Sequence, residues 1–186
     1  MELLSRLQDD ELPAGEMNPF CFAEPLAPLV AARKRRQRID QGDVLARIQR
    51  VQSRCECLLI EGSGGLMVPL GEGFFVADVI AALDCDVVVV AQNKLGVINH
   101  TLLTSRVLAL HGVRRMKIAL LARRRADLSA RTNSKILAEL LAPIRVINLP
   151  FLGVGANRAD VLKKKHKKLK KTLAEICNFA TFCPAL

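Results

Sequence analysis

Short apolar segments alternate with amphipathic ones along most of the chain. Four mostly apolar segments have lengths typical of buried β-strands: 57–60, 86–91, 117–121 and 144–149. Between them, apolar residues recur every three or four positions, which predicts helices over 75–83, 98–110 and 132–141. Alternation of this kind predicts an α/β fold, a parallel sheet with helices on both faces and right-handed crossovers.

The two ends of the chain are less regular. Residues 2–12 predict a short amphipathic helix, and prolines break residues 18–28 into a loop. Asp40 has the character of a cap for a helix that continues through 44–51. Beyond Gly155 the pattern gives way to a lysine-rich segment. We therefore expect one domain over 1–155 and a lysine-rich helix or tail over 156–186.

One glycine-rich loop has residues suited to a metal and phosphate site. The apolar run Leu58–Ile60 stops at Glu61 and continues into the turn 62–65, which contains Gly62, Gly64 and Gly65. A carboxylate at the end of a strand suits Mg²⁺, and glycines allow the backbone to approach a charged ligand. The alternative is a tight turn whose glutamate points into solvent.

A second loop opens a helix directly after a predicted strand. The segment Lys94–Thr101 offers Asn99 or Thr101 as a cap, and the free N–H groups of a helix start attract anions. Lys94 is suited to holding a carboxylate or phosphate, whereas His100 is better explained as a helix-start residue. Sequence order brings together no Ser/His/Asp or Cys/His arrangement, so no catalytic residue is predicted.

Composition narrows the classes of partner. The net charge is +10, and the densest basic run is Lys163–Lys171. A solvated helical face explains this run better than nucleic-acid binding, which we expect to be weak at most and salt-dependent. All the aromatic residues are phenylalanine, so stacking residues are sparse. No apolar run is long enough to span a bilayer, and no membrane partner is expected.

Six cysteines and three histidines invite a disulfide or metal interpretation. The cysteines form no CxxC pair, and several lie beside apolar segments. We therefore interpret them as small buried residues in a reducing compartment, and the N-terminus lacks the apolar region of a signal peptide. These observations predict a cytoplasmic protein.

Several strings, taken together, resemble the dethiobiotin synthetase family, P-loop-type α/β ligases of biotin synthesis. They follow the family's order and spacing over about residues 2–155, and the LGxINHxxLT string with EGxGG is the most specific part. The matching segments are Asn18–Pro25, Ile60–Leu70, Phe74–Val79, Asn93–Thr104 and, less distinctively, Leu149–Gly153.

The resemblance implies closure of the ureido ring of dethiobiotin from 7,8-diaminononanoate and CO₂, with ATP and Mg²⁺. It implies a role in Mg²⁺ binding for Glu61 and in nucleotide binding for Glu61, Gly62, Ser63 and Gly64. It also implies that the adenine is bordered by Pro150, Phe151 and Leu152. In a homodimer, the diamine site of the partner subunit would be reached by Leu95, Gly96, Val97, Ile98 and Asn99.

The chain departs from the family pattern in two places. No GxxxxGK[ST] sequence occurs in the 186 residues, so we expect the fold to lack the N-terminal strand and phosphate loop. Ala122 and Arg123 stand near the place of an asparagine on the adenine side. We expect the chain alone to be impaired unless an upstream segment restores the loop. The alternative is a non-catalytic remnant that acts as a dimerisation or basic polyanion-binding module.

Overall fold

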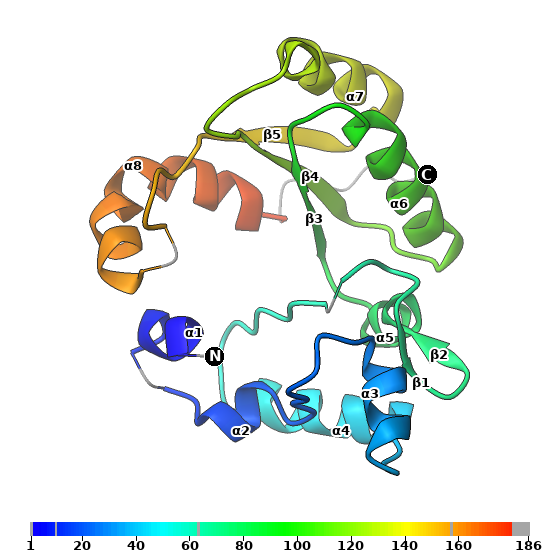
Figure 1. Ribbon diagram of the computed structural model, residues 1–186. Helices are drawn as coiled ribbons and strands as arrows, with labels where there is room; N and C mark the ends of the chain where they lie inside the picture. Colours follow the sequence, from blue (N-terminus) through cyan, green and yellow to red (C-terminus); the bar gives the residue numbers. More distant parts are fainter. Residues whose placement is uncertain (1, 10, 63, 157, 180–186) are drawn as a thin grey trace. The chain divides into compact units, whose positions relative to one another are not determined.

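The chain divides into two compact units in a computed structural model (Figure 1). The structure describes residues 2–9, 11–62, 64–156 and 158–179. The N-terminal unit is Met1–Asp84 and the C-terminal unit is Cys85–Leu186. Each unit has its own buried apolar cluster. The expected division at residue 155 is not tested by these observations and stays a prediction.

The C-terminal unit is built on a parallel three-stranded sheet in the order β3-β4-β5 (Figure 1). Its strands are β3 (Val87–Gln92), β4 (Met116–Leu121) and β5 (Arg145–Leu149). Three α-helices and one 3₁₀ helix are described here: α6 (Val97–Leu110), η1 (Leu128–Arg131), α7 (Asn133–Leu141) and α8 (Ala159–Cys177). The predicted second, third and fourth strands are thus confirmed, with the predicted helices between them.

Alternate residues of β4 point to opposite faces of the sheet, and both faces are covered. On one face, Ile118 and Leu120 belong to a buried cluster with Val97 of α6 and with Leu137 of α7. On the other face, Ala119 forms a second buried cluster with Ile147 of β5 and Ile176 of α8. The predicted arrangement, helices on both faces of a parallel sheet, is confirmed for this unit.

The end of α8 is fixed to the sheet by a buried lysine. Lys117 on β4 is 2% exposed, and its Nζ donates to the carbonyl oxygens of Glu175 at 2.6 Å, Ile176 at 3.3 Å and Asn178 at 2.6 Å. These carbonyls are among those that a helix end leaves without partners. The Phe179 ring centroid lies 4.5 Å from the same Nζ. Burial lowers the pKa of Lys117, and nearby Arg145 lowers it further.

β3 differs from the buried strand that its apolar sequence predicts. Among the strands that the structure describes it pairs with β4 alone, and Val90 is 65% exposed. β4, with a neighbour on each side, has five consecutive buried residues, Met116–Leu120. Position in the sheet, rather than the length of the apolar run, therefore decides which strand is buried.

The N-terminal unit is mainly helical. Its helices are α1 (Glu2–Leu7), α2 (Ala14–Met17), α3 (Pro28–Lys34), α4 (Gln41–Gln52) and α5 (Val76–Leu83). A short antiparallel pair, β1 (Pro69–Gly71) and β2 (Phe74–Phe75), precedes α5. The buried cluster of this unit contains Ala32, Ile39, Phe74 and Val79.

Local contacts explain where two of these helices begin. The Asp40 side chain accepts a hydrogen bond from the Gly42 N–H at 2.8 Å, which confirms the predicted acidic cap of α4. At the start of α5, the Asp78 carboxylate accepts from the Phe75 N–H at 2.7 Å. The turn before β2 requires glycine at Gly71, because a Cβ there would lie 2.2 Å from the Phe74 ring.

Two expectations from the sequence are wrong. Residues 57–60 form no strand, and Leu59 is 86% exposed, because an apolar run becomes a strand only where another strand accepts its hydrogen bonds. None of the five cysteines that the structure describes is buried: Cys21, Cys57 and Cys177 are exposed, and Cys55 and Cys85 are partly exposed. All five of these described cysteines are free thiols. Among the described residues, no helix is long and apolar enough to cross a membrane.

Candidate functional site

Three loops of the C-terminal unit start at one edge of the sheet. In the strand register, Gln92 is opposite Leu121, and Leu121 is opposite Leu149, so the carboxyl ends of β3, β4 and β5 are level. The ladder continues one residue further, since Asn93 N–H donates to the Leu121 carbonyl and Ala122 N–H to the Leu149 carbonyl, both at 2.9 Å. Ligands of open parallel sheets bind at this edge.

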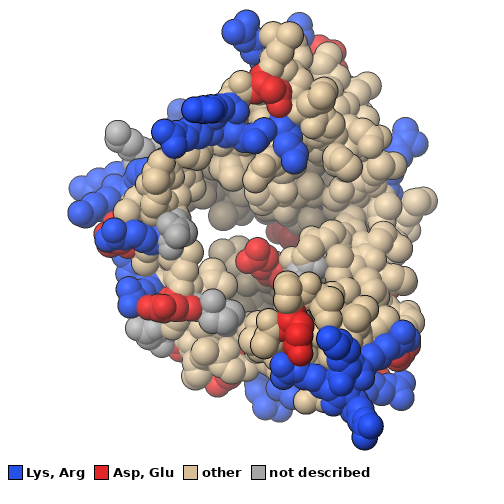
Figure 2. Space-filling model, in the orientation of Figure 1, with Lys and Arg blue, Asp and Glu red and all other residues tan. Residues whose placement is uncertain are grey.

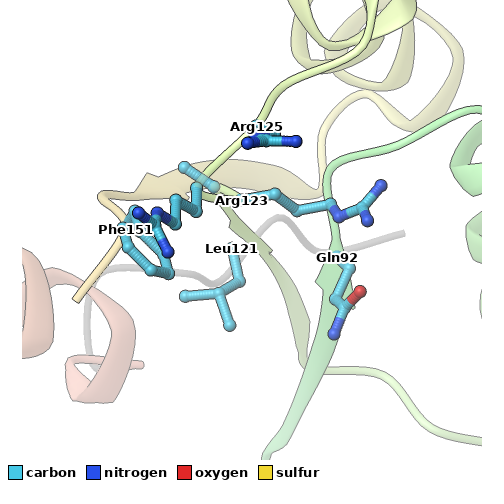
Figure 3. A pocket seen from close by; sticks show the side chains of 7 residues that line it. Gln92, Leu121, Arg123, Arg125 and Phe151 are labelled. Atoms are coloured by element: carbon cyan, nitrogen blue, oxygen red, sulfur yellow. The ribbon is translucent and has the colours of Figure 1, made fainter. Parts of the chain in front are cut away.

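A hollow of about 450 Å³ lies at this edge (Figure 3). In the view of Figure 3, Leu121 lies between Phe151 and Gln92, and arginine side chains extend from the loop after β4. The hollow is lined by Gln92, Leu121, Ala122, Arg123, Arg124, Arg125 and Phe151. The structure therefore brings Phe151, a predicted adenine-side residue, together with Ala122 and Arg123, which stand near the place where the resemblance leads us to expect an asparagine.

The hollow is strongly basic. Lys and Arg side chains gather over α8 and over the loop after β4 in this unit (Figure 2). Within the described parts of the chain, Arg123, Arg124 and Arg125 form no ion pair or hydrogen bond, and no carboxylate lines the hollow. Three unpaired guanidinium groups favour a ligand rich in hydrogen-bond acceptors or negative charge.

The loop after β3 is fixed by side-chain amides. Asn133 is 3% exposed, and its Nδ2 donates to Asn93 Oδ1 at 2.8 Å and to the Lys94 carbonyl at 3.3 Å. Asn93 Nδ2 in turn donates to the Ala130 carbonyl at 3.0 Å. The start of the LGxIN segment is therefore held by hydrogen bonds to η1 and α7.

Asp127 holds the same loop from the other side. Its Oδ2 accepts from the Leu95 N–H at 3.0 Å, while its Oδ1 accepts from the Ser129 hydroxyl at 2.6 Å and the Ala130 N–H at 3.3 Å. The Ser129 hydroxyl, followed by the backbone N–H of Leu95, lowers the pKa of Asp127. An ionised carboxylate is thus the form that this loop requires.

The five predicted diamine-site residues separate into three groups. Val97 is buried in the core and Ile98 is packed against it, so these two hold α6 on the sheet. Gly96 begins α6 with φ of +91°, a conformation that favours glycine. Leu95, 79% exposed, and Asn99, also exposed, remain accessible to a ligand or a partner.

The loop after β5 is tied to α8. Lys165 Nζ donates a hydrogen bond to the Leu152 carbonyl. The next residue, Gly153, has φ of +86°, and a Cβ there would lie 2.6 Å from that Nζ. The lysine-rich helix therefore contacts the predicted nucleotide loop directly.

Glu61 and the neighbouring predicted phosphate-side residues Gly62 and Gly64 belong to the N-terminal unit, whereas the predicted adenine-side and diamine-site residues belong to the C-terminal unit. Glu61, Gly62 and Gly64 are exposed, and Ser63 lies outside the described residues. Residues 56–62 make no backbone hydrogen bond to another described residue. Gly64 has φ of +80°, which suits glycine. The described residues contain no group of three or more His, Cys, Asp or Glu side chains placed for a metal.

Sequence reasoning missed Asp127, Asn133 and Lys165. Asp127 precedes a short helix, and an Asx residue at that position was a usable signal for a cap. Asn133 and Lys165 act through partners 40 and 13 residues away, and nothing local in their sequence indicates those contacts.

Comparison with known proteins agrees with this geometry. A family model described as an AAA domain matches residues 2–167. The parallel sheet and its pocket beyond the strand ends, with this match, place the chain in the class of AAA-type α/β domains.

The relatives narrow the class further. An ATP-dependent dethiobiotin synthetase BioD of Bacillus licheniformis is 37% identical over 159 residues, which is 85% of this chain and 65% of that protein. The protein of the same name in Bacillus subtilis strain 168 is 34% identical over 162 residues, 87% of this chain and 68% of that protein. The chain belongs to the dethiobiotin synthetase BioD family. It spans about two thirds of the length of these relatives.

Proposed function

We propose that the chain takes part in nucleotide-dependent closure of the ureido ring of dethiobiotin from 7,8-diaminononanoate and CO₂. The observation that carries the proposal is the hollow lined by Phe151 and residues 121–125, at the sheet edge where the family resemblance places the nucleotide base. The relatives from Bacillus licheniformis and Bacillus subtilis are ATP-dependent dethiobiotin synthetases. A cytoplasmic location stays a prediction.

The base of the nucleotide would lie against Phe151, with Pro150 and Leu152 beside it. Phe151 supplies an aromatic face beyond the carboxyl edge of the sheet, and stacking on such a face contributes about 1–3 kcal/mol per base. The Lys165 hydrogen bond to the Leu152 carbonyl would hold this loop in place. The residues of the loop therefore act by positioning rather than by chemistry.

Magnesium would arrive as MgATP. Protein sites for Mg²⁺ usually supply one or two carboxylates, and substrate phosphates and water supply the remaining ligands. Glu61 is exposed and flanked by glycines, so it fits the role of one such carboxylate. Gly62, Ser63 and Gly64 would line the phosphates. In phosphoryl transfer of this kind, the protein mainly positions groups and neutralises charge.

The LGxIN loop would bind the diamine of a partner subunit in a homodimer. Leu95 is an exposed apolar residue on a loop that Asp127 and Asn133 hold firmly, an arrangement suited to contact with another protein chain. The first N–H groups of α6, a helix without a side-chain cap at Gly96, suit the carboxylate of diaminononanoate. Asn99 lies on the first turn of the same helix.

The 186 residues contain no P-loop, so we expect the chain alone to form no measurable dethiobiotin. Loss of one oxyanion-type donor typically costs about a hundredfold or more in rate, and a whole phosphate loop supplies several donors and a lysine. The test joins an N-terminal strand and GTDTxxGKT loop, as the resemblance implies, to the chain. Dethiobiotin is then measured by mass spectrometry with diaminononanoate, bicarbonate, Mg²⁺ and nucleotide.

The joined protein should form product, and its Glu61→Gln variant should lose most of that activity. Glu56→Gln is the matched control, because Glu56 is an exposed carboxylate in the same segment. Product from the unmodified chain would refute the expected impairment. A folded joined protein that forms no product with any nucleoside triphosphate would count against the proposed function.

A second function is favoured by one observation, the exposed lysines of α8. Lys163, Lys164, Lys167, Lys170 and Lys171 are exposed on a single helix. A non-catalytic module that binds polyanions through these charges would lose affinity steeply between low and moderate salt. Retention on immobilised nucleic acid that persists at moderate salt would favour this alternative over the ligase.

A further inference from the structure

We propose that the pocket at the ends of β3, β4 and β5 selects guanine over adenine through the guanidinium groups of Arg123 and Arg125. This inference rests on the proposed function, because it assumes that the pocket receives the base of a nucleoside triphosphate. It changes which base this chain prefers. The residues involved all belong to the C-terminal unit and line one hollow (Figure 3).

The polar side chains that line the hollow offer mostly hydrogen-bond donors. A guanidinium group donates hydrogen bonds and accepts none. Arg123, Arg124 and Arg125 have no hydrogen-bond or ion-pair partner within the described chain, so their donors are free for a ligand. Gln92 is the one lining residue whose side chain also offers an acceptor, its Oε1.

Guanine and adenine present opposite patterns to such a lining. Guanine offers two adjacent acceptors, O6 and N7, and bidentate contact from arginine to these atoms is the commonest specific contact to this base. Adenine places an amino group, a donor, in the position of O6. That amino group would face guanidinium donors, and Gln92 Oε1 is the one side-chain acceptor in the lining that could receive it. The N1–H and amino group of guanine would still find an acceptor at Gln92.

Phe151 contributes affinity without choosing a base. Every base has a π-face, so stacking on an aromatic ring tolerates any of them. Selectivity must therefore come from the edge of the base, where the arginines lie. The chain has Ala122 and Arg123 near the place where the family resemblance expects an asparagine, and asparagine is a side chain that pairs with adenine N6 and N7.

The test measures nucleotide binding to the full 186-residue chain by saturation-transfer NMR, which detects dissociation constants in the millimolar range. Titrations with GTP and with ATP follow the H8 proton of each base. A good bidentate base contact changes affinity by about 5- to 150-fold. Because these arginines are exposed, we expect the lower end, a GTP dissociation constant about fivefold below that of ATP.

Two variants and one control separate the effect of the arginine on base preference from the effect of aromatic stacking on affinity. Arg123→Gln replaces a donor-only group with one that pairs well with adenine, so the fivefold preference should fall to about one or reverse. Arg131→Gln is the matched control, because Arg131 is exposed in the same unit but does not line the hollow. Phe151→Ala should raise the dissociation constants of GTP and ATP by a similar factor.

The outcomes distinguish this inference from the proposed function on which it rests. Equal or tighter binding of ATP by the unmodified chain, together with sensitivity to Phe151→Ala, would overturn the guanine preference and leave the proposed function standing. Displacement of GTP by inorganic triphosphate as effectively as by GDP would show that the arginines bind phosphate, and would also overturn it. The absence of H8 saturation with every nucleotide would overturn the guanine preference, whereas the proposed function is decided by product formation in the joined protein.

Discussion

At the scale of single residues, Asp127 joins the loop after β3 to the loop after β4. Its two carboxylate oxygens accept from Leu95 in the loop after β3 and from Ser129 and Ala130 in η1, which follows β4. All three groups donate, so the side chain must accept on both oxygens. A substitution at Asp127 that keeps the size of the side chain but removes one acceptor should therefore still disturb the loop.

Asp127→Asn should loosen the LGxIN loop. Asparagine has one acceptor oxygen, and its NH₂ would face either the Leu95 N–H or the Ser129 and Ala130 donors. We expect faster amide hydrogen exchange at Leu95, with little change in the core strand β4. Asp160→Asn is the control, because Asp160 bonds to Arg158 at the start of α8 instead. Unchanged exchange at Leu95 would show that Asn133 alone fixes the loop.

The same carboxylate predicts a pH dependence. The pKa of Asp127 in the folded chain lies below its ordinary value of about 3.9. The folded state therefore gains stability from Asp127 above the unfolded pKa and loses that gain as the pH falls through the folded pKa. Urea unfolding between about pH 2 and pH 6 should show a steeper loss of stability in the unmodified chain than in Asp127→Asn. Parallel curves would contradict the assignment.

Lys117→Met should lower the free energy of unfolding by about 1–3 kcal/mol. The substitution keeps an apolar stem in the core but leaves the carbonyls of Glu175, Ile176 and Asn178 without their buried donor. Lys164→Met, on the exposed face of α8, should change stability by less than about 0.5 kcal/mol. Denaturant unfolding measures both. Equal effects of the two variants would mean that the contacts of Lys117 carry no net stability.

At the scale of elements, α8 packs against the sheet as part of the folded C-terminal unit, although it contains seven lysines. Leu169 and Ile176 are buried, and Ile176 packs against Ala119 and Ile147. The helix thus supplies the cover for one face of the sheet and, through Lys165, a contact to the loop after β5. Its charged residues occupy the remaining surface.

Ile176→Ala should destabilise the C-terminal unit by about 2–4 kcal/mol, since it removes buried methyl groups from the cover of β4 and β5. Leu173→Ala, a change of similar size at a residue that is 39% exposed, should cost less than half as much. Thermal unfolding followed by circular dichroism compares the two. Similar losses would indicate that the helix is held by Lys117 and not by apolar packing.

Periodicity predicted the elements of the C-terminal unit because their apolar residues face a common core. β3, β4, β5 and α6 all lie where the alternation placed them, and the acidic cap of α4 is also as expected. Leu58–Ile60 has an equally apolar sequence and forms no strand. A strand requires a neighbour to complete its backbone hydrogen bonds, and apolar pattern alone does not show whether one is present.

The candidate site was predictable only in part, for a similar reason. Phe151 and the residues around Ala122 follow strands, so their place at the carboxyl edge of the sheet could be inferred from the order of elements. Asn133 and Lys165 reach that edge from helices, through contacts that depend on how the helices pack. Sequence spacing contains no information about those contacts.

At the scale of the whole molecule, Leu95 predicts the oligomeric state that the proposed function requires. Light scattering after size-exclusion chromatography should show a dimer, and Leu95→Glu should shift it towards monomer by placing a charge in the interface. Leu110→Glu is the matched control, an exposed leucine at the opposite end of α6. A monomer at about 100 μM, or equal effects of both variants, would contradict the homodimer.

The hydrogen bonds from Lys117 to the end of α8 have a consequence for synthesis of the protein in the cell. The acceptor carbonyl of Glu175 lies 58 residues after Lys117 in the sequence. At a translation rate of about 5–20 residues per second, roughly 3–12 s pass before the ribosome has made the partner of this lysine. During that interval the uncovered face of the sheet would carry the Lys117 ammonium group on its middle strand, and a charged group favours hydration of that face. The same lysine that later fixes the helix can therefore protect the nascent sheet from premature association.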